Sequence, residues 1–295
     1  MSALWFDADL DDPTSPGMTR PTPVDNIAAL TKDQRALRVR HLIQQSHSIV
    51  DDAISTHLGG RTLVGSVVLY SGGNDSTTLA HMMRRRATHA AHANTGIGIE
   101  RTREFVRDTC AMWGLPLIEK HPPTSYRDLV LERGFPGPPM HFKMYTRLKE
   151  RGLDQVRRDL VTDPRSQRVL YIAGRRRSES QRRASVPIHE RRGSTIWASP
   201  LAMWTKLDLA TYRTLHDVPE NPVSQALHMS GECLCGAFAR PGELDEIGFW
   251  FPEMREQIES LEREVRAAGH PEPLCRWGHG AGAPSKVGPL CDSCD

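Results

Sequence analysis

Residues 67–78 contain the side chains best suited to chemistry in this chain. They read Val-Val-Leu-Tyr-Ser-Gly-Gly-Asn-Asp-Ser-Thr-Thr, and a helix-compatible segment, 77–86, follows at once. A strand, a tight turn and a helix start in that order form an anion site, because backbone N–H groups converge at the positive end of the helix dipole. Gly72 and Gly73 allow a sharp bend and a close approach to a ligand. The segment predicts a phosphate-binding loop; an ordinary strand-to-helix turn with two glycines is the alternative.

The side chains of this loop add hydrogen-bond donors and a carboxylate. Asp75 can hold a phosphate-bound Mg2+, and no lysine follows the glycines, so this is not the loop that ends in Gly-Lys-Ser/Thr. We expect the loop to bind the phosphates of a nucleotide through seven consecutive residues: Ser71, Gly72, Gly73, Asn74, Asp75, Ser76 and Thr77.

Two further turns carry polar residues. One is Asn94-Thr95-Gly96, followed by Glu100, and the other is residues 174–183, Gly-Arg-Arg-Arg-Ser-Glu-Ser-Gln-Arg-Arg. Arg176 and Arg183 can each form two hydrogen bonds with phosphate or sulfate oxygens, and Glu179 can orient one of them. A solvated basic helix start or a nucleic-acid contact is the alternative for the arginine run.

Short apolar segments precede each of these turns. The expected strands alternate with helices, which predicts an α/β fold with a parallel sheet covered on both faces. The expected strands are residues 64–70, 89–94, 115–119 and 168–173. Ligands of such folds bind at the carboxyl ends of the strands, where all three polar turns lie. The turns are therefore expected to form one composite site.

The remaining sequence suggests four consecutive parts. A helix should begin at the capping box of Thr31 and Gln34 and end at Leu58-Gly59-Gly60. Another should span residues 252–268, whereas the proline-rich residues 121–139 should form a long loop. The expected parts are a flexible arm (1–25), a helical segment (26–60), a nucleotide-binding α/β domain (61–226) and a cysteine-rich metal-binding module (227–295).

Composition narrows the function classes. At 295 residues with a net charge of +2, the chain can bury a full core, and its charge alone does not argue for nucleic acid. Arginine outnumbers lysine 32 to 6. Its planar guanidinium group forms paired hydrogen bonds with phosphate and sulfate, which favours anion binding, although a GC-rich genome would also raise the arginine content. The chain has no run of 18 apolar residues and no signal-peptide pattern, so we expect a cytoplasmic protein without membrane contact.

The cysteines gather near the end of the chain. Five of the six follow residue 232, which in a reducing compartment suggests metal binding or catalysis rather than disulfides. Cys233-x-Cys235 and Cys291-x-x-Cys294 supply four thiolates in two close pairs, for which a [4Fe–4S] cluster and Zn2+ are both chemically suitable. Cys110 lies in a helical segment and is expected to be a small buried hydrophobe.

The three turns together resemble a known superfamily. The pattern Ser-Gly-Gly-x-Asp-Ser is similar to the PP-loop of the ATP pyrophosphatases. The two later turns resemble signatures of its PAPS reductase-like branch, an Asp-Thr-Gly turn and a Gly-x-Arg-x-x-Glu-Ser-x-x-Arg turn. Asn94 replaces the usual aspartate, whereas the second pattern is matched by Gly174, Arg176, Glu179, Ser180 and Arg183. The resemblance covers about residues 60–240.

This resemblance implies an adenine nucleotide alpha hydrolase-like fold and an activity. The loop would hold the β,γ-pyrophosphate of ATP while the α-phosphorus is attacked and AMP is transferred to an acceptor, in sulfur transfer. Residues 94–96 and Gly174 would contact the nucleoside, and Asp75, Arg176 and Arg183 would be catalytic. The family also favours an iron–sulfur cluster over zinc in the cysteine-rich module.

Two rival functions stay open. True PAPS reductases usually lack the two glycines of the first loop and carry a catalytic cysteine in a Glu-Cys-Gly-Leu-His segment, whereas this chain keeps the loop and ends Leu-Cys-Asp-Ser-Cys-Asp. One rival is nonetheless reduction of PAPS to sulfite by a tail cysteine, and the other is a nucleic-acid-binding accessory protein with a zinc ribbon. ATP and an unidentified acceptor are the expected partners; a sulfur donor protein, nucleic acid and a second copy of the chain remain open.

Overall fold

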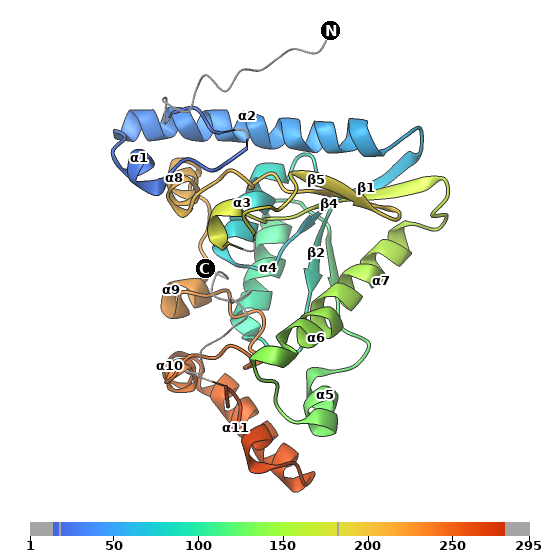
Figure 1. The fold of residues 1–295 in the computed structure, drawn as a ribbon, viewed down its shortest axis with the longest axis vertical. Coiled ribbons are helices and arrows are strands. Elements are labelled where there is room, and N and C mark those ends of the chain that lie inside the picture. Colours follow the sequence, from blue (N-terminus) through green and yellow to red (C-terminus); the bar gives the residue numbers. More distant parts are fainter. Residues whose placement is uncertain (1–13, 18, 182, 281–295) are drawn as a thin grey trace. The chain divides into compact units, whose positions relative to one another are not determined.

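A computed structural model of the chain describes residues 14–17, 19–181 and 183–280 (Figure 1). The chain divides into two units, each of which gathers segments that are distant in sequence. The first comprises Met1–Leu69, Asp75–His89 and Leu160–Pro219, and the second Tyr70–Asn74, Ala90–Asp159 and Glu220–Asp295. Six strands belong to one mostly parallel sheet, which confirms the predicted α/β fold class. The predicted division into four consecutive parts stays a prediction.

Four strands and their helices make up the first unit. The strand order is β1-β4-β6-β5, with β1, β4 and β6 parallel and β5 antiparallel to β6. Val67 pairs with Tyr171, which pairs in turn with Trp197. The middle of β4 is a run of buried apolar residues, as expected for a central parallel strand. The elements are α1 (Val24–Ala28), α2 (Lys32–His57), β1 (Thr62–Leu69), α3 (Asn74–Met83), β4 (Gln167–Ile172), η3 (Arg177–Glu179), β5 (His189–Arg192), β6 (Thr195–Ala198) and α8 (Lys206–His216).

The long helix α2 confirms the predicted capping box. Gln34 donates its backbone N–H to Thr31 Oγ1 at 3.3 Å, and Thr31 donates to Gln34 Oε1 at 2.9 Å. The helix packs against α8 and against β5 and β6 (Figure 1). A buried ion pair between Arg38 and Asp208, 2.8 Å from Nε to Oδ1, joins α2 to α8.

Two parallel strands and a larger number of helices make up the second unit. Ala90 of β2 pairs with Leu117 of β3, and His92 with Glu119. The elements are β2 (His89–Ala93), α4 (Glu100–Met112), β3 (Leu117–Lys120), α5 (Tyr126–Arg133), η1 (Pro138–Met140), α6 (His141–Tyr145), η2 (Thr146–Glu150), α7 (Arg151–Leu160), α9 (Pro222–Leu227), α10 (Glu243–Trp250), α11 (Pro252–Ala267) and η4 (Glu272–Cys275).

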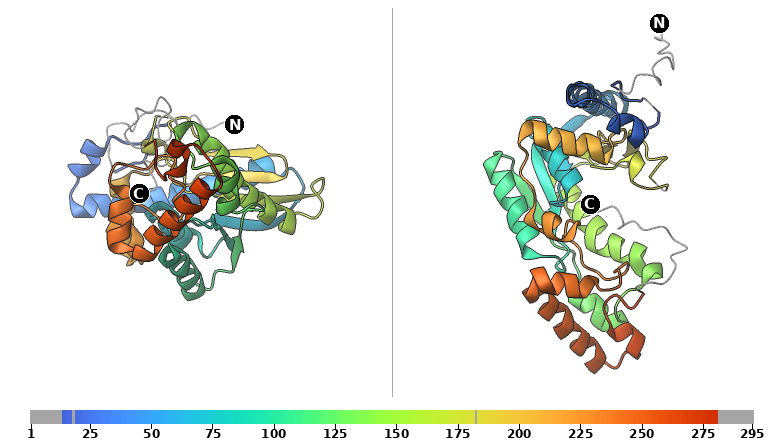
Figure 2. Two further views of the ribbon diagram at one scale, coloured as in Figure 1. Left: turned by 90° about the horizontal axis from the view of Figure 1, so that it is seen from below. Right: turned by 90° about the vertical axis from the view of Figure 1, so that its left-hand side faces the viewer.

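Helix α11 confirms the predicted amphipathic helix. It buries Met254, Ile258, Leu261 and Val265 along one face. This face packs against α10 and α5, as the right-hand view of Figure 2 shows. The face belongs to a hydrophobic core that also contains residues of α5 and the Cys233–Cys235 segment.

Two expectations about the elements were wrong. The predicted loop at residues 121–139 contains α5, because Ser125 caps the helix by accepting a 3.0 Å hydrogen bond from the backbone N–H of Asp128. The hairpin of β5 and β6 was not predicted, and its turn places Gly193 at φ +60°. This hairpin adds one antiparallel strand to a sheet expected to be wholly parallel.

None of the helices in the described ranges is both long and apolar enough to cross a membrane.

Candidate functional site

The glycine turn before α3 is tightly packed within the second unit. Gly72 has φ +81°, and a Cβ at this position would lie 2.8 Å from Thr102 Cγ2 and 3.1 Å from Val106 Cγ2. Any larger residue would therefore be strained in its backbone and would also clash with α4. The predicted need for glycine at position 72 has a clear steric basis.

Asn221 holds this turn in place, and the sequence analysis missed it. Its Nδ2 donates to the carbonyl of Gly72 at 3.0 Å and to Thr102 Oγ1 at 3.1 Å. Its Oδ1 accepts from the backbone N–H of Val223 and so caps α9. The visible signal was Asn221-Pro222, an N-cap followed by proline at the first helical position.

Helix α3 begins with buried polar residues in the first unit. Asp75, Ser76 and Thr77 follow the turn directly, and the side chain of Asp75 is 15% exposed. Asp75 Oδ2 lies 2.5 Å from Nε of Arg176, whose side chain is only 1% exposed. Gly174 lies beside this pair, and a Cβ there would be 3.7 Å from the backbone of Asp75 and Ser76, an ordinary contact distance that does not by itself require glycine.

The Arg176 guanidinium has an unused donor. Nε bonds to Asp75, and Nη1 donates to Ser178 Oγ at 3.3 Å. Nη2 is buried and has no hydrogen-bond partner in the part of the chain that the structure describes. A buried donor without a partner costs about 1–3 kcal/mol, so an anion that accepts from Nη2 would be favoured here.

Opposing effects act on the carboxyl group of Asp75, and burial is the largest of them. Burial raises the pKa of its carboxyl group, and the positive charge of Arg176 opposes that rise. Arg213 and Arg183 also act in the direction that lowers this pKa. Because Asp75 already pairs with Arg176, its assignment as a Mg2+ ligand stays a prediction.

Glu179 orients Arg183, as the sequence led us to expect. The two side chains form an ion pair, with Glu179 2% exposed and Arg183 26% exposed. The pair follows η3, which turns the chain after β4. Arg183 is thus the more accessible of the two predicted catalytic arginines.

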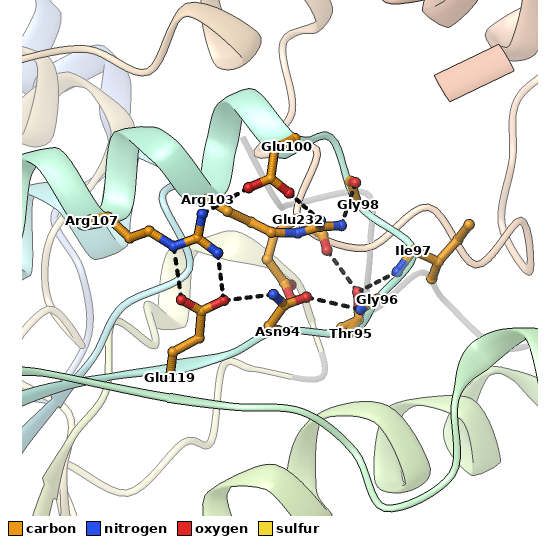
Figure 3. A network of polar contacts seen from close by, with 10 residues as sticks. All are labelled: Asn94, Thr95, Gly96, Ile97, Gly98, Glu100, Arg103, Arg107, Glu119 and Glu232. Carbon is orange, nitrogen blue, oxygen red and sulfur yellow. Dashed lines mark hydrogen bonds and ion pairs between the residues drawn. The ribbon is translucent and has the colours of Figure 1, made fainter. Parts of the chain in front are cut away.

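The turn after β2 is held by its own side chains, as Figure 3 shows. Asn94 Nδ2 donates to Glu119 Oε1 at 2.6 Å, and Asn94 Oδ1 accepts from the backbone N–H of Gly96 at 3.0 Å. An aspartate at position 94 would lose the donor and would repel Glu119. Asparagine at position 94 therefore suits the neighbouring carboxylate of Glu119 better than the usual aspartate would.

Charged residues of α4 extend this network (Figure 3). Arg107 donates to both oxygens of Glu119, each at 2.9 Å, and also pairs with Glu100 at 2.7 Å. Arg103 pairs with Glu100 and donates to the carbonyl of Gly98, each at 2.5 Å. Hydrogen bonding from Arg107 lowers the pKa of Glu119 to about 2.

The same turn contacts the segment that carries the first cysteine pair. Thr95 Oγ1 donates to the backbone carbonyl of Glu232 at 2.8 Å. A Cβ on Gly98 would lie 2.2 Å from that carbonyl oxygen, so only glycine fits there. The buried carboxylate of Glu232 pairs with Lys149 Nζ at 2.5 Å. Cys233 is consequently fixed beside the predicted nucleoside-binding turn.

The two cysteines of this segment lie close to each other. A hydrogen bond between their thiols raises the pKa of Cys233 and lowers that of Cys235. The backbone is held by Leu234, whose N–H donates to the carbonyl of Ile97 at 2.6 Å, and by Tyr126, whose hydroxyl donates to the carbonyl of Cys235 at 2.9 Å.

Only two of the four predicted metal ligands, Cys233 and Cys235, lie among the described residues. Cys291 and Cys294 lie outside the described residues. Within those residues, no group of three or more His, Cys, Asp or Glu side chains is placed to hold a metal ion. Cys275 is fully buried, and its Sγ donates to the carbonyl of His270 at 3.3 Å. Cys110 is buried as expected, and burial raises its pKa to about 12.

The predicted site residues thus fall into two groups, one in each unit. The first unit contains Asp75, Ser76, Thr77, Gly174, Arg176, Glu179 and Arg183, and the second contains Ser71, Gly72, Gly73, Asn74, Asn94, Thr95, Gly96, Cys233 and Cys235. The side chains of Asn94 and Thr95 are bonded within the protein, which leaves the backbone of Gly96, with open space around its Cα, as the accessible part of that turn.

Comparison with known proteins confirms the resemblance drawn from the three turns. The family model for the phosphoadenosine phosphosulfate reductase domain matches residues 65–233. An adenosine 5'-phosphosulfate reductase of Chelativorans sp. (strain BNC1) is 29% identical over 237 residues, which are 78% of this chain and 90% of that protein. A phosphoadenosine 5'-phosphosulfate reductase of Xanthomonas axonopodis pv. citri (strain 306) is 33% identical over 87 residues, which are 30% of this chain and 32% of that protein.

A solved structure of low sequence identity also aligns with part of the chain. The phosphate complex of phosphoadenylyl-sulfate reductase from Candida auris aligns with a TM-score of 0.44 and 16% identity. The alignment covers 63% of this chain and 90% of that one.

Proposed function

Because the chain belongs to the phosphoadenosine phosphosulfate reductase domain family, we propose that it binds ATP at residues 71–77 and 174–183 and cleaves it to AMP and pyrophosphate. The proposal depends mainly on the buried guanidinium of Arg176, which has an unused donor and lies at the start of α3. A guanidinium and a helix N-terminus together favour a phosphate group. The acceptor, a sulfur donor protein and a cytoplasmic location stay predictions.

The residues would act by positioning and by neutralising charge. An acceptor oxygen attacks the α-phosphorus, the bond to the bridging oxygen breaks, and pyrophosphate leaves while AMP stays on the acceptor. Where water is the attacking group, the products are free AMP and pyrophosphate. Asp75 fixes Arg176, and Glu179 fixes Arg183, so that both cations are oriented before the nucleotide arrives. Mg2+, when bound, would neutralise part of the pyrophosphate charge, and we propose Asp75 as its carboxylate ligand.

The test is to separate the products of labelled ATP after incubation with the full chain and Mg2+. Wild-type protein should yield AMP and pyrophosphate, and Asp75→Ala should lose that activity. Asp245→Ala is the matched control, because Asp245 is 77% exposed on α10. Release of γ-phosphate alone, or a preference for a sulfonucleotide with no turnover of ATP, would contradict the proposal.

A second candidate, reduction of a sulfonucleotide, is favoured by the position of Cys233. The Thr95–Glu232 hydrogen bond places this cysteine beside the predicted nucleoside turn, and the 29% identical relative is an adenosine 5'-phosphosulfate reductase. The Cys233 sulfur, passing its proton to the Cys235 thiolate, would attack the sulfonate sulfur and displace the nucleotide phosphate. Attack by Cys235 on Cys233 Sγ would then release sulfite and form a disulfide, which an external dithiol reduces.

Sulfite release separates the two candidates. Adenosine 5'-phosphosulfate or its 3'-phosphorylated form would be supplied together with dithiothreitol. If the reductase candidate is right, the wild type should release sulfite, Cys233→Ser should release none, and Cys110→Ser should behave as wild type. If Cys233→Ser retains full activity in both assays, Cys233 has no role in either reaction.

We also propose that Cys233 and Cys235 share a metal centre with Cys291 and Cys294. The two described thiols are close together and largely buried, as ligands of one ion or cluster would be. Metal ligation would occupy the Cys233 thiol that the reductase candidate needs. The metal content and the number of free thiols therefore discriminate between a metal centre and a reductase site. In anaerobically purified protein, Cys233→Ser and Cys291→Ser should lose iron or zinc to the same extent. Cys275→Ser should keep the metal. If the wild-type protein contains neither iron nor zinc, the proposal of a metal centre is wrong.

A further inference from the structure

The edge of the first unit where β1 and β4 begin is rich in arginine. The strand register places Leu63 opposite Arg168, and Val169 opposite Thr195, which in turn pairs with Arg192 of β5. This edge is at the amino end of β4, six residues before Gly174. At about 3.3 Å per residue, it lies roughly 20 Å from the nucleotide turn at Gly174.

Arg168 is buried at this edge. It is 5% exposed, and its Nη1 donates to the carbonyls of Pro164 and Gln167, each at 2.7 Å. Its Nε is buried without a hydrogen-bond partner in the part of the chain that the structure describes. Burial, together with the guanidinium groups of Arg61 and Arg191, lowers the pKa of Arg168.

The two exposed arginines beside it bond to carbonyl groups. Arg61 donates to the carbonyls of Gly59 at 2.9 Å and Arg165 at 3.3 Å, and Arg191 donates to that of Gly193 at 2.9 Å. Among the described residues, none of Arg61, Arg168 and Arg191 forms an ion pair with a carboxylate.

Nearby carboxylates are engaged elsewhere. Asp163 accepts from the hydroxyl of Ser166 and from the backbone N–H of Arg165, and Glu190 pairs with Arg175 and Arg192. The two other buried arginines among the described residues of this unit are each paired with a carboxylate, Arg38 with Asp208 and Arg176 with Asp75. Asp163 keeps its negative charge, because its hydrogen-bond donors are neutral, but the three arginines outnumber it and leave the edge with a net positive charge.

We propose that Arg61 and Arg191, beside the buried charge of Arg168, bind the sugar–phosphate backbone of a nucleic acid, at a surface separate from the nucleotide site. From β1 to β5 the edge spans three strand spacings, about 14 Å. A single phosphate would occupy only part of that span, whereas duplex DNA presents one charge per 1.7 Å of its axis, or about eight charges over it. Guanidinium groups form two hydrogen bonds with each phosphate, and such contacts do not read sequence.

The experiment measures fluorescence anisotropy of fluorescein-labelled 20-base-pair DNA and of a 20-nucleotide RNA with the full chain, from 50 to 200 mM salt. Wild-type protein should bind both probes, more weakly as salt rises. Arg61→Gln with Arg191→Gln should weaken duplex binding at least tenfold at 50 mM salt. It should also reduce the slope of log affinity against log salt by about 1.8, since each lost phosphate contact removes about 0.9.

The control is Arg40→Gln with Arg263→Gln, which removes the same charge from exposed positions on α2 and α11. Arg40 lies on α2 about 26 Å before its end at His57. The control should bind as the wild type, and the Arg61/Arg191 variant should keep its melting temperature. Equal loss in both double variants, or an unchanged affinity in the Arg61/Arg191 variant, overturns the proposal. Complete competition by 1 mM inorganic phosphate would also overturn it, because the site would then take a single anion.

Discussion

Two arginine–carboxylate pairs of this protein lie next to predicted nucleotide-binding turns, yet their hydrogen bonding is opposite. In the second unit, Arg107 donates to both oxygens of Glu119, and Glu119 also accepts from Asn94. In the first unit, Arg176 donates to Asp75 but keeps Nη2 buried without a described partner.

This difference indicates that Arg107 has a structural role and that Arg176 can bind a ligand. A network in which each donor has an acceptor stabilises the turn and offers little to a ligand. A buried guanidinium with an unused donor is less stable by itself and gains when an anion completes it. We therefore expect changes at Arg176 to affect binding and stability together, and changes around Glu119 to affect stability alone.

Arg176→Ala should give the largest effect. It leaves Asp75 buried without its cation, which should lower the free energy of unfolding by about 3–5 kcal/mol. ATP binding should weaken by about 1.5–3 kcal/mol through the loss of charge-assisted hydrogen bonds. Urea denaturation and titration calorimetry would measure the two quantities.

A double variant sharpens this result. Asp75→Asn combined with Arg176→Ala should recover part of the stability, because no unpaired charge is left, but none of the ATP binding. If calorimetry shows wild-type affinity in both variants, Arg176 is a structural residue and the contrast between the two pairs fails.

Glu119→Gln should give a pH-dependent effect of intermediate size. The pKa of Glu119 in the folded protein, about 2, is below its usual value of 4.5, so the ionised form stabilises the fold above about pH 4.5. The full shift corresponds to roughly 3 kcal/mol, which partial exposure reduces to about 1–2 kcal/mol. The stability difference from wild type should be constant between pH 5 and 7 and shrink as the pH falls toward 3. If the stability difference between wild type and Glu119→Gln instead grows as the pH falls, the ionised form of Glu119 does not stabilise the fold and the prediction is wrong.

Asn94→Asp should be smaller, about 1 kcal/mol at pH 7. The new carboxylate loses the hydrogen bond to Glu119 and repels it, although Arg107 lies close enough to offset part of the repulsion. Thermal denaturation at pH 7 would detect the loss, and ATP affinity should change little. A large loss of affinity with unchanged stability would assign the Asn94 side chain to the ligand instead.

Glu104→Gln should have the smallest effect, at most about 0.5 kcal/mol. Its partner Arg101 is 62% exposed, and exposed pairs one turn apart on a helix contribute little. It lies on α4 like Arg107 and so serves as the control for charge removal on that helix. A loss as large as that of Glu119→Gln would mean that helix charge, rather than the turn network, sets stability there.

Patterns that depend on local sequence were predicted well. The capping box of Thr31 and Gln34 is a local interaction, and the apolar spacing of α11 reflects one buried face. The ion pair of Glu179 and Arg183 also follows from spacing along the chain. Such features need no knowledge of distant segments.

Features that depend on distant segments were missed. Asn221 reaches Gly72 from 149 residues away, and Arg107 meets Glu119 only because α4 and β3 lie together in the fold. Strand β5 of the hairpin reads His-Glu-Arg-Arg and lacks the apolar alternation that marks a strand, and β6, although mostly apolar, has only four residues. Nor did the sequence show that Arg176 would pair with Asp75, although both were predicted site residues.

The π-helical turn η2 has a consequence for how this chain can change length. It accommodates one extra residue in a widened turn between α6 and α7, and it carries Lys149, the partner of buried Glu232. Removing a single residue from Thr146–Glu150 would restore an ordinary α-helix and shift the residues on one side of the deletion by one position, about 100° around the axis. Lys149 would then point away, and a buried carboxylate would be left without its cation. Deletions at this turn should thus be tolerated far less readily than the same deletions in an exposed loop.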